Sequence, residues 1–194
     1  MNHPTLTDIT KQNIEEAFWQ LYKTGGMSKV SVTQICKVAG YNRSTFYAYY
    51  EDVYAVLNAI EEKIIPSETF KEELLLPLMH CQDEKVLLEK VLSFFELHSP
   101  YLPILLGEYG DPLFRHKLLT RFSPILYSYF AGNDQTTQKL NYILEYQNAA
   151  VISTIAKWYQ NGKDIPTSEL IELLLELTRH GVSAALKKRE NCDL

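Results

Sequence analysis

The stretch 31–50, SVTQICKVAGYNRSTFYAYY, most narrowly constrains the fold, because it carries the start and stop signals of two short helices. Ser31 opens a capping-box pattern, which predicts the start of a helix. Gly40 is predicted to end that helix, since a residue without a Cβ adopts the left-handed conformation of a helix end at little cost. Asn42 supplies a second N-cap, so another helix is predicted over 43–50.

Residue spacing in this stretch predicts one buried and one polar face. Four residues at i, i+4 spacing are predicted to form a shared core, namely Ile35, Ala39, Phe46 and Tyr50. Hydrogen-bonding and aromatic residues remain outside it, namely Arg43, Ser44, Thr45, Tyr47 and Tyr49. Two helices joined by a short turn with Gly follow the helix-turn-helix plan, whose second helix enters the DNA major groove. An ordinary helical hairpin is the alternative interpretation.

Residues 7–60 resemble the DNA-binding domain of the TetR family of bacterial transcriptional regulators. The matching features are an amphipathic first helix ending at Gly25-Gly26, the run Val32-Thr33-x-Ile35, the run Ala39-Gly40-Tyr41-Asn42, and Ser44-Thr45-Phe46-Tyr47-x-Tyr49-Tyr50-x-Asp52 followed by Leu57. The last run is similar to the family pattern T-[LF]-Y-x-[HY]-F-x-[ND]-K-x-x-L. Val53 departs from that pattern where the family usually has Lys, so a phosphate contact usual in the family is expected to be lost or shifted to other basic groups.

The chemistry of the polar face and the resemblance together predict a set of residues that contact double-stranded DNA. Arg bonds guanine bidentately, and hydroxyl groups bond base edges or phosphates. The predicted DNA-binding residues are Ser31, Thr33, Asn42, Arg43, Ser44, Thr45, Tyr47 and Tyr49.

The distribution of charge agrees with this interpretation although the chain carries a net charge of −5. Residues 1–50 hold five basic and three acidic residues, whereas the remainder holds 14 basic and 21 acidic ones. Phosphate binding needs local positive charge rather than a basic chain overall.

No secretory signal and no apolar run of membrane-spanning length is recognisable, so a cytoplasmic protein without membrane contact is expected. The three cysteines, Cys36, Cys81 and Cys192, are widely spaced and lack His partners at metal-ligand distances. Neither a metal site nor a cofactor is expected. Redox sensing by Cys81 or Cys192 is an alternative with little support, because nothing nearby would lower a thiol pKa.

Helical periodicity runs through the whole chain and predicts an all-α protein. Helices are predicted over 7–23, 52–65, 67–80, 83–98, 101–107, 112–130, 136–161 and 167–188, besides the two in 31–50. Kinks or breaks are expected at Pro103 and Pro124. The predicted organisation is a three-helix helix-turn-helix domain in 1–50, a connecting helix in 51–66, and a larger helical ligand-binding and dimerisation domain in 67–194.

The last two predicted helices indicate a homodimer. Apolar residues occupy nearly every direction of the segment 140–158, and small residues follow the leucines of the final helix. A four-helix interface about a two-fold axis would cover them, and family members dimerise through the equivalent helices. The predicted interface residues are Ile152, Ile155, Trp158, Leu174, Leu177, Gly181 and Ala185. Burial within one large monomeric core is the alternative.

Aromatic residues with polar tips are frequent between residues 83 and 160, and the resemblance implies an effector pocket there. The candidate lining residues are Phe95, His98, Tyr101, Tyr109, Phe122, Tyr127 and Tyr146. The same composition also describes an ordinary helical core, and it does not name the ligand.

Sequence motifs of catalysis are lacking, since no Gly-rich phosphate loop, G-x-S-x-G or H-E-x-x-H occurs and the His residues are scattered. No catalytic residue is therefore predicted, and an enzyme is not expected. The sequence predicts a ligand-responsive, dimeric transcriptional regulator, most simply a repressor of an inverted-repeat operator. The alternatives are an activator or co-regulator acting through a protein partner, and a ligand-binding helical module without DNA function.

Overall fold

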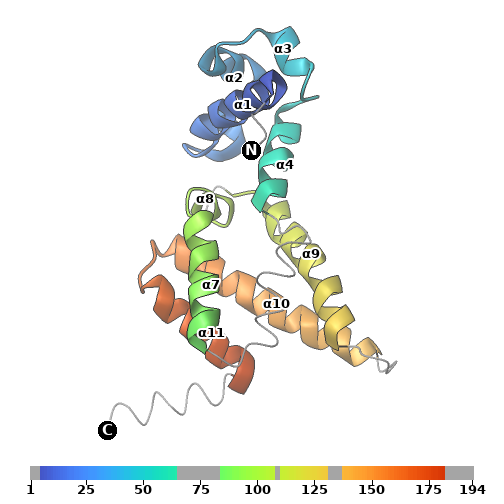
Figure 1. The fold of residues 1–194 in the computed structure, drawn as a ribbon, viewed down its shortest axis with the longest axis vertical. Helices are drawn as coiled ribbons and strands as arrows, with labels where there is room; N and C mark the ends of the chain where they lie inside the picture. Colours follow the sequence, from blue (N-terminus) through green and yellow to red (C-terminus); the bar gives the residue numbers. More distant parts are fainter. Residues whose placement is uncertain (1–4, 65–83, 108–109, 131–136, 182–194) are drawn as a thin grey trace. The chain divides into compact units, whose positions relative to one another are not determined.

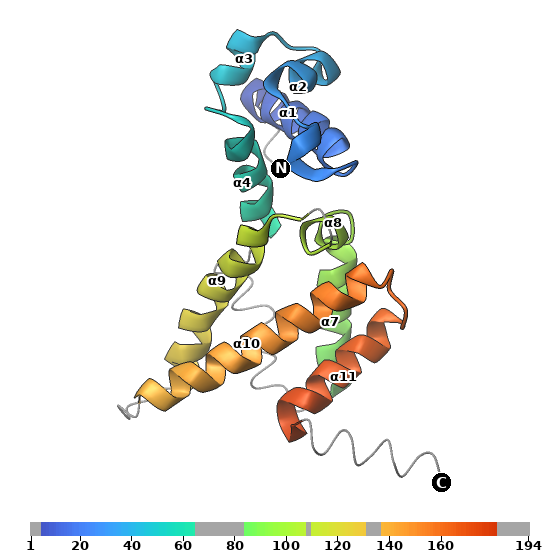
Figure 2. The same cartoon turned by 180° about the vertical axis from the view of Figure 1, so that it is seen from behind.

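The computed structural model describes residues 5–64, 84–107, 110–130 and 137–181, and the regular elements in these ranges are all helical (Figures 1 and 2). The all-α class predicted from the sequence is confirmed there. The chain divides into two compact units, Met1–Ile65 with Tyr109–Asp111, and Pro66–Glu108 with Pro112–Leu194. The finer domain boundaries expected from the sequence stay a prediction.

The first unit contains four α-helices and one 3-10 turn. They are α1 (Leu6–Tyr22), η1 (Gly26–Lys29), α2 (Val32–Ala39), α3 (Arg43–Tyr47) and α4 (Val53–Ile64). Helix α1 lies at the centre and packs against both α2 and α4, while α3 packs against α2. The short α2–α3 pair is therefore held on one long helix.

Capping by side chains determines where these helices begin. The Thr5 side chain and the Asp8 backbone and carboxylate form a reciprocal capping box at the start of α1. At α2 the Gln34 amide donates to the Ser31 hydroxyl over 3.3 Å, and that hydroxyl donates to the Gln34 side-chain oxygen over 2.7 Å. Gly40 ends α2 with φ 74°. Each predicted cap of the α2–α3 pair is thus present.

The core of the first unit is apolar and drawn from all four α-helices. Its most buried members, each at most 4 % exposed, are Ile14, Ala17, Phe18, Tyr22, Ile35, Phe46, Val56, Leu57, Ile60 and Ile64. Burial raises the pKa of Tyr22 to about 12. Two acids, Glu15 and Glu61, are buried beside this core.

The second unit contains the remaining described helices. They are α7 (Glu84–Leu97), α8 (Leu102–Leu105), α9 (Pro112–Phe130), α10 (Thr137–Gln160) and α11 (Thr167–His180). The long helix α10 packs against α8, α9 and α11, and α11 also packs against α7 (Figure 2).

Some predicted boundaries differ from those observed. Helix α3 ends at Tyr47 and not at Tyr50, and the amides of Tyr49 and Tyr50 both bond to the Phe46 carbonyl in the turn that follows. Helix α9 continues through Pro124, and Pro103 lies in the first turn of α8, where its missing N–H costs little.

Other predicted elements cannot be compared in full. The helix expected over 67–80 lies outside the described residues, as does the end of the helix expected over 167–188. The described part of the latter ends at His180, before Gly181 at φ 78°.

Candidate nucleic-acid interface

Helix α3 is anchored in the core by the aromatic side chain of Phe46. Phe46 is fully buried, and its ring lies 6.0 Å from the ring of Tyr50, which is 7 % exposed. Ile35 of α2 is fully buried as well. This is the small core predicted from the i, i+4 spacing, with Ala39 half-buried at its edge. A helix of five residues gains little from its own hydrogen bonds, so this packing and its cap keep it formed.

The cap of α3 is a single oxygen with three donors. Asn42 Oδ1 accepts the Thr45 amide at 2.8 Å, the Ser44 hydroxyl at 2.6 Å and the Thr45 hydroxyl at 3.0 Å. The first of these bonds satisfies an N–H that has no partner within the helix. The other two orient hydroxyl groups at the edge of the exposed face.

Arg43 connects α3 to α2 at the surface. Its Nη2 donates a short hydrogen bond to the hydroxyl of Thr33, and both residues are exposed. The guanidinium has five N–H donors, so one bond leaves others for an acceptor outside the protein. Thr33 thereby orients the only full positive charge of α3.

Hydrogen bonds join five of the predicted DNA-binding residues, since Arg43 bonds to Thr33 and both Ser44 and Thr45 bond to Asn42. Ser31, Thr33, Asn42, Arg43, Ser44 and Tyr47 are exposed, while Thr45 and Tyr49 are half-buried. Tyr47 is 57 % exposed although its ring meets that of Phe46 edge-on at 5.5 Å. An exposed row of hydroxyl, amide and guanidinium groups on a short helix has the composition that base edges and phosphates require.

The start of α4 carries the departure from the family pattern. The Asp52 carboxylate accepts the Ala55 amide at 2.8 Å and so caps the helix. Val53 is half-buried, and the adjacent Tyr54 is 65 % exposed. Where the family pattern has a positively charged Lys, this chain therefore has a half-buried apolar residue.

A buried polar network beside α3 was missed by sequence reasoning. Glu15 of α1 accepts the Tyr50 hydroxyl at 2.8 Å, and its other oxygen pairs with Lys63 of α4. Burial, with the hydrogen bond to Glu15, raises the pKa of Tyr50 well above its usual range. The signal that could have revealed this network was a Glu within the apolar stripe of α1.

Comparison with protein families identifies a family for most of the second unit. Residues 85–180 match the TetR-type family described as the transcriptional regulator C-terminal region. The chain is a TetR-type transcriptional regulator. The resemblance stated for residues 7–60 is thereby supported from the other part of the chain. Comparison of the regulator with curated proteins gave no significant match.

Solved structures share the fold of the regulator at low sequence identity. A TetR transcriptional regulator from Streptococcus agalactiae has 21% identity and a TM-score of 0.62, covering 87% of this chain and 93% of its own. FadR from Bacillus subtilis in complex with stearoyl-CoA has 21% identity and a TM-score of 0.61, with coverages of 88% and 98%. The dihydroxyacetone kinase operon activator DhaS has 20% identity and a TM-score of 0.54, with coverages of 86% and 94%.

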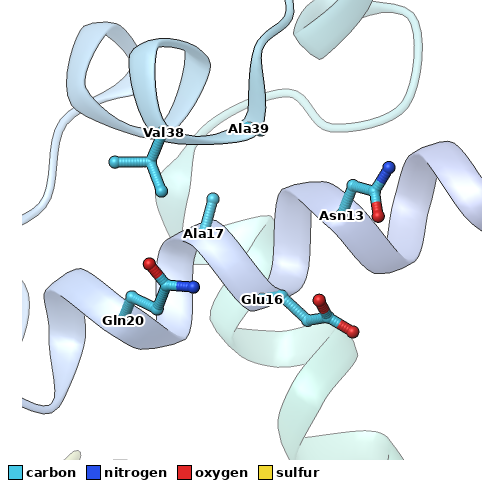
Figure 3. Close-up of a pocket in the computed structure, with 6 residues that line it drawn as sticks. All are labelled: Asn13, Glu16, Ala17, Gln20, Val38 and Ala39. Carbon is cyan, nitrogen blue, oxygen red and sulfur yellow. The ribbon is translucent and has the colours of Figure 1, made fainter.

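An open pocket lies between α1 and α2 of the regulator (Figure 3). Three polar residues, Asn13, Glu16 and Gln20, and three apolar ones, Ala17, Val38 and Ala39, line it. None of these residues belongs to the predicted effector pocket. Val38 is 46 % exposed at its rim.

The predicted effector-pocket residues are only partly brought together. Phe95 is buried, and His98 and Tyr101 are half-buried nearby in sequence. The His98 ring lies 4.6 Å from that of Phe94, and burial lowers its pKa. Tyr146 is 67 % exposed, so it does not share their environment.

The remaining candidates for that pocket are not placed. Tyr109 lies outside the described residues. Phe122 and Tyr127 belong to α9, but the structure does not describe their side chains. The effector pocket therefore stays a prediction.

Two predicted interface residues also belong to the core of the second unit. Ile152 and Trp158 are 8 % and 4 % exposed within a single chain, so most of their surface is already covered without a second copy, and their place in an interface stays a prediction. Trp158 donates to the Ile165 carbonyl at 2.8 Å and packs edge-on against Phe95. Their apolar character reflects the core of the second unit.

The other predicted interface residues are more accessible. Ile155, Leu174 and Leu177 are half-buried and Gly181 is exposed, whereas Ala185 lies outside the described residues. The large apolar side chains of α10 that are exposed are Tyr142, Ile143 and Tyr146. None of the described helices is long and apolar enough to cross a bilayer.

Proposed function

We propose that the regulator is an effector-responsive repressor that acts in the cytoplasm as a homodimer on an inverted-repeat operator. The observation that carries the proposal is the exposed polar face of α3, held outward by the burial of Phe46 beneath it. In a helix-turn-helix protein such a face enters the major groove, and two copies bind two half-sites.

The proposed contacts divide into two kinds. Arg43 is suited to guanine, because its guanidinium bonds the O6 and N7 acceptors together. Ser31, Thr33, Ser44 and Tyr47 carry hydroxyl groups suited to phosphates, which position the protein without specifying sequence. Because Val53 stands where relatives have Lys, one positive charge is missing from the phosphate contacts. The DNA affinity should therefore depend less on salt concentration than that of a relative with Lys at this position.

Selection of DNA by the full-length protein tests this proposal. A randomised duplex pool is passed over the purified protein, and the affinity for the selected sequence is compared with that for random DNA at several salt concentrations. We expect an inverted repeat to be selected, with specific binding at least about 10³-fold tighter than random binding.

Variants locate the contact surface. Arg43→Ala with Tyr47→Ala should abolish specific binding, since it removes the charge and the most exposed ring of α3. Lys157→Ala is the matched control, because it removes an exposed positive charge from α10 in the other unit. Equal affinity for selected and random DNA in the wild-type protein would favour the helical module without DNA function.

Assembly as a homodimer is proposed from the partly exposed apolar residues Ile155, Leu174 and Leu177, which a second copy would cover. Sedimentation of the full-length protein measures the assembly state, and Leu177→Glu is expected to give monomers with weaker operator binding. A wild-type protein that stays monomeric at the concentration where it binds DNA would contradict this part of the proposal.

The effector is proposed to be a molecule with a long apolar part, to be tested first with a long-chain acyl-CoA. FadR from Bacillus subtilis, which shares the fold, contains stearoyl-CoA in its structure. Release of operator DNA by stearoyl-CoA, with no release by coenzyme A alone, is the expected result. The alternative of an activator is supported by the fold likeness to the activator DhaS, and transcription in vitro from a promoter with the selected site separates activation from repression.

A further inference from the structure

Glu15 is a buried acid whose carboxylate is engaged on both oxygens. It lies in the middle of α1 and is 8 % exposed, next to the core residues Ile14 and Ala17. One oxygen accepts the Tyr50 hydroxyl at 2.8 Å, and the other pairs with the Lys63 ammonium. A carboxylate out of water is tolerated only when it is paired and hydrogen-bonded, so these two partners explain its position.

The two partners lie near opposite ends of α4. Tyr50 lies between the end of α3 and the start of α4, and Lys63 lies in the last turn of α4. A helix of 12 residues is about 18 Å long at a rise of 1.5 Å per residue. A single carboxylate on α1 therefore bonds to one residue that precedes α4 and to one in the last turn of α4.

Tyr50 also connects this carboxylate to α3. Its amide donates to the Phe46 carbonyl at 3.0 Å, and its ring lies 6.0 Å from the Phe46 ring. Phe46 is the buried anchor of the face that carries Arg43 and Tyr47. The hydroxyl is an addition of this chain, because the family pattern has Phe where Tyr50 stands.

We propose that Glu15 is a positioning residue of the DNA-binding surface, which sets α3 relative to α4 through its bonds to Tyr50 and Lys63. The proposal rests on the proposed function, in which α3 contacts DNA. Movement of α4 along α1 breaks one of the two bonds and leaves a buried acid oxygen without a partner. The carboxylate thus favours one arrangement of α3, and a displacement at either end of α4 alters that arrangement.

Three substitutions separate the two bonds. Glu15→Gln removes the ion pair and leaves an oxygen that can accept the Tyr50 hydroxyl. Tyr50→Phe removes only the hydroxyl, and Lys63→Met removes only the charge. The Lys63 side chain is 63% exposed, so Lys63→Met leaves no cavity, and thermal unfolding of this variant measures the cost of a Glu15 carboxylate without its ion pair. Lys63→Arg keeps the charge and serves as the conservative variant.

The readout is the affinity of the full-length protein for the selected operator and for random DNA of the same length in the same buffer. We expect Tyr50→Phe and Lys63→Met each to weaken operator binding by about tenfold, the equivalent of one lost bond to a charged group, with random-DNA binding unchanged. Lys63→Arg should keep wild-type affinity. The double variant of Glu15→Gln with Lys63→Met should bind no more weakly than Glu15→Gln alone, because both remove the same ion pair.

Glu16→Gln is the matched control, since Glu16 is the adjacent exposed acid of α1 and bonds only within its helix to Gln12 among the contacts described. It should change neither affinity. Thermal unfolding of each variant is measured in parallel.

Two results would overturn the proposal. One is a loss of operator and random-DNA affinity by the same factor in each variant. The other is a loss of operator affinity that follows thermal stability alone, as for any destabilised fold. Wild-type protein without specific binding would instead contradict the proposed function, before any variant is compared.

Discussion

Replacing Asn42 by Ala tests whether one side-chain oxygen keeps α3 formed. Three donors converge on Asn42 Oδ1, but only the Thr45 amide is a helix donor without an alternative partner in the helix. The two hydroxyl groups belong to an exposed and a half-buried residue, so water can replace their bonds. The expected cost is therefore that of one N-cap, about 1 kcal/mol within a range of about 0.5–2.

This cost should appear locally before it appears globally. A difference of 1 kcal/mol corresponds to an opening equilibrium about fivefold larger, so hydrogen exchange of amides in 43–50 should be about fivefold faster in Asn42→Ala. For a domain of 60–100 residues the same cost lowers Tm by about 4–8 °C. Exchange followed by mass spectrometry on the full-length protein measures the first quantity, and calorimetry measures the second.

Asn42→Ser is the matched control, because Ser keeps an oxygen at the N-cap and lacks the amide group. Exchange in 43–50 should stay within about twofold of the wild type in this variant, since Ser is as good a cap as Asn. Equal exchange in the Ala and Ser variants would refute the reasoning, and it would mean that the packing of Phe46 alone holds α3.

Three further substitutions test other parts of the first unit. Gly40→Ala should destabilise the first unit by about 1 kcal/mol, because Gly40 has a φ of +74° and a Cβ is disfavoured in this conformation, even though it would meet no atom within 4 Å. Denaturant unfolding measures this loss, and an unchanged unfolding midpoint would contradict the prediction. Stability should fall as pH rises from 10 to about 12, because the folded state keeps the Tyr22 phenol protonated and the unfolded state does not. Tyr22→Phe should reduce this fall and Tyr54→Phe, at an exposed phenol, should leave it, as alkaline unfolding curves will show. Thr33→Val should weaken operator binding several-fold and Thr33→Ser should not, because the hydroxyl group that orients Arg43 is kept only in the Ser variant. Equal operator binding by both variants would show that the bond between Thr33 and Arg43 does not contribute to DNA affinity.

The caps and the turn of the α2–α3 pair could be predicted because their determinants are local. Ser31, Gly40 and Asn42 each act within three or four residues of chain, and the structure contains all three features. The end of α3 was predicted three residues too late. Tyr50 continues the helical spacing of Phe46, but its hydroxyl bonds to Glu15, which is 35 residues away in sequence. A tertiary bond of this kind is invisible to periodicity.

Interpretation of the apolar residues in the second unit was limited by a different ambiguity. A helix that is apolar on all sides must be covered, but the pattern does not state whether its own chain or a second copy covers it. Ile152 and Trp158 were assigned to an interface, and both are buried in their own chain. Tyr142 and Tyr146, whose hydroxyl groups make them look like core or pocket residues, are the exposed aromatics of α10. Burial, rather than hydropathy, separates these two groups.

Glu15 shows why the most informative residue of the first unit was overlooked. On a helical wheel it lies beside Ile14 and Phe18, where a single acid is usually interpreted as the border of the solvent-exposed face. Its environment is decided by two residues that follow it by 35 and 48 positions, and neither is identifiable as a partner from spacing. The cap that starts α3 acts within three residues of chain, whereas the bonds of Glu15 that orient α3 relative to α4 join residues far apart in sequence. Substitutions of caps should therefore change how often α3 is formed, and substitutions around Glu15 should change where it points.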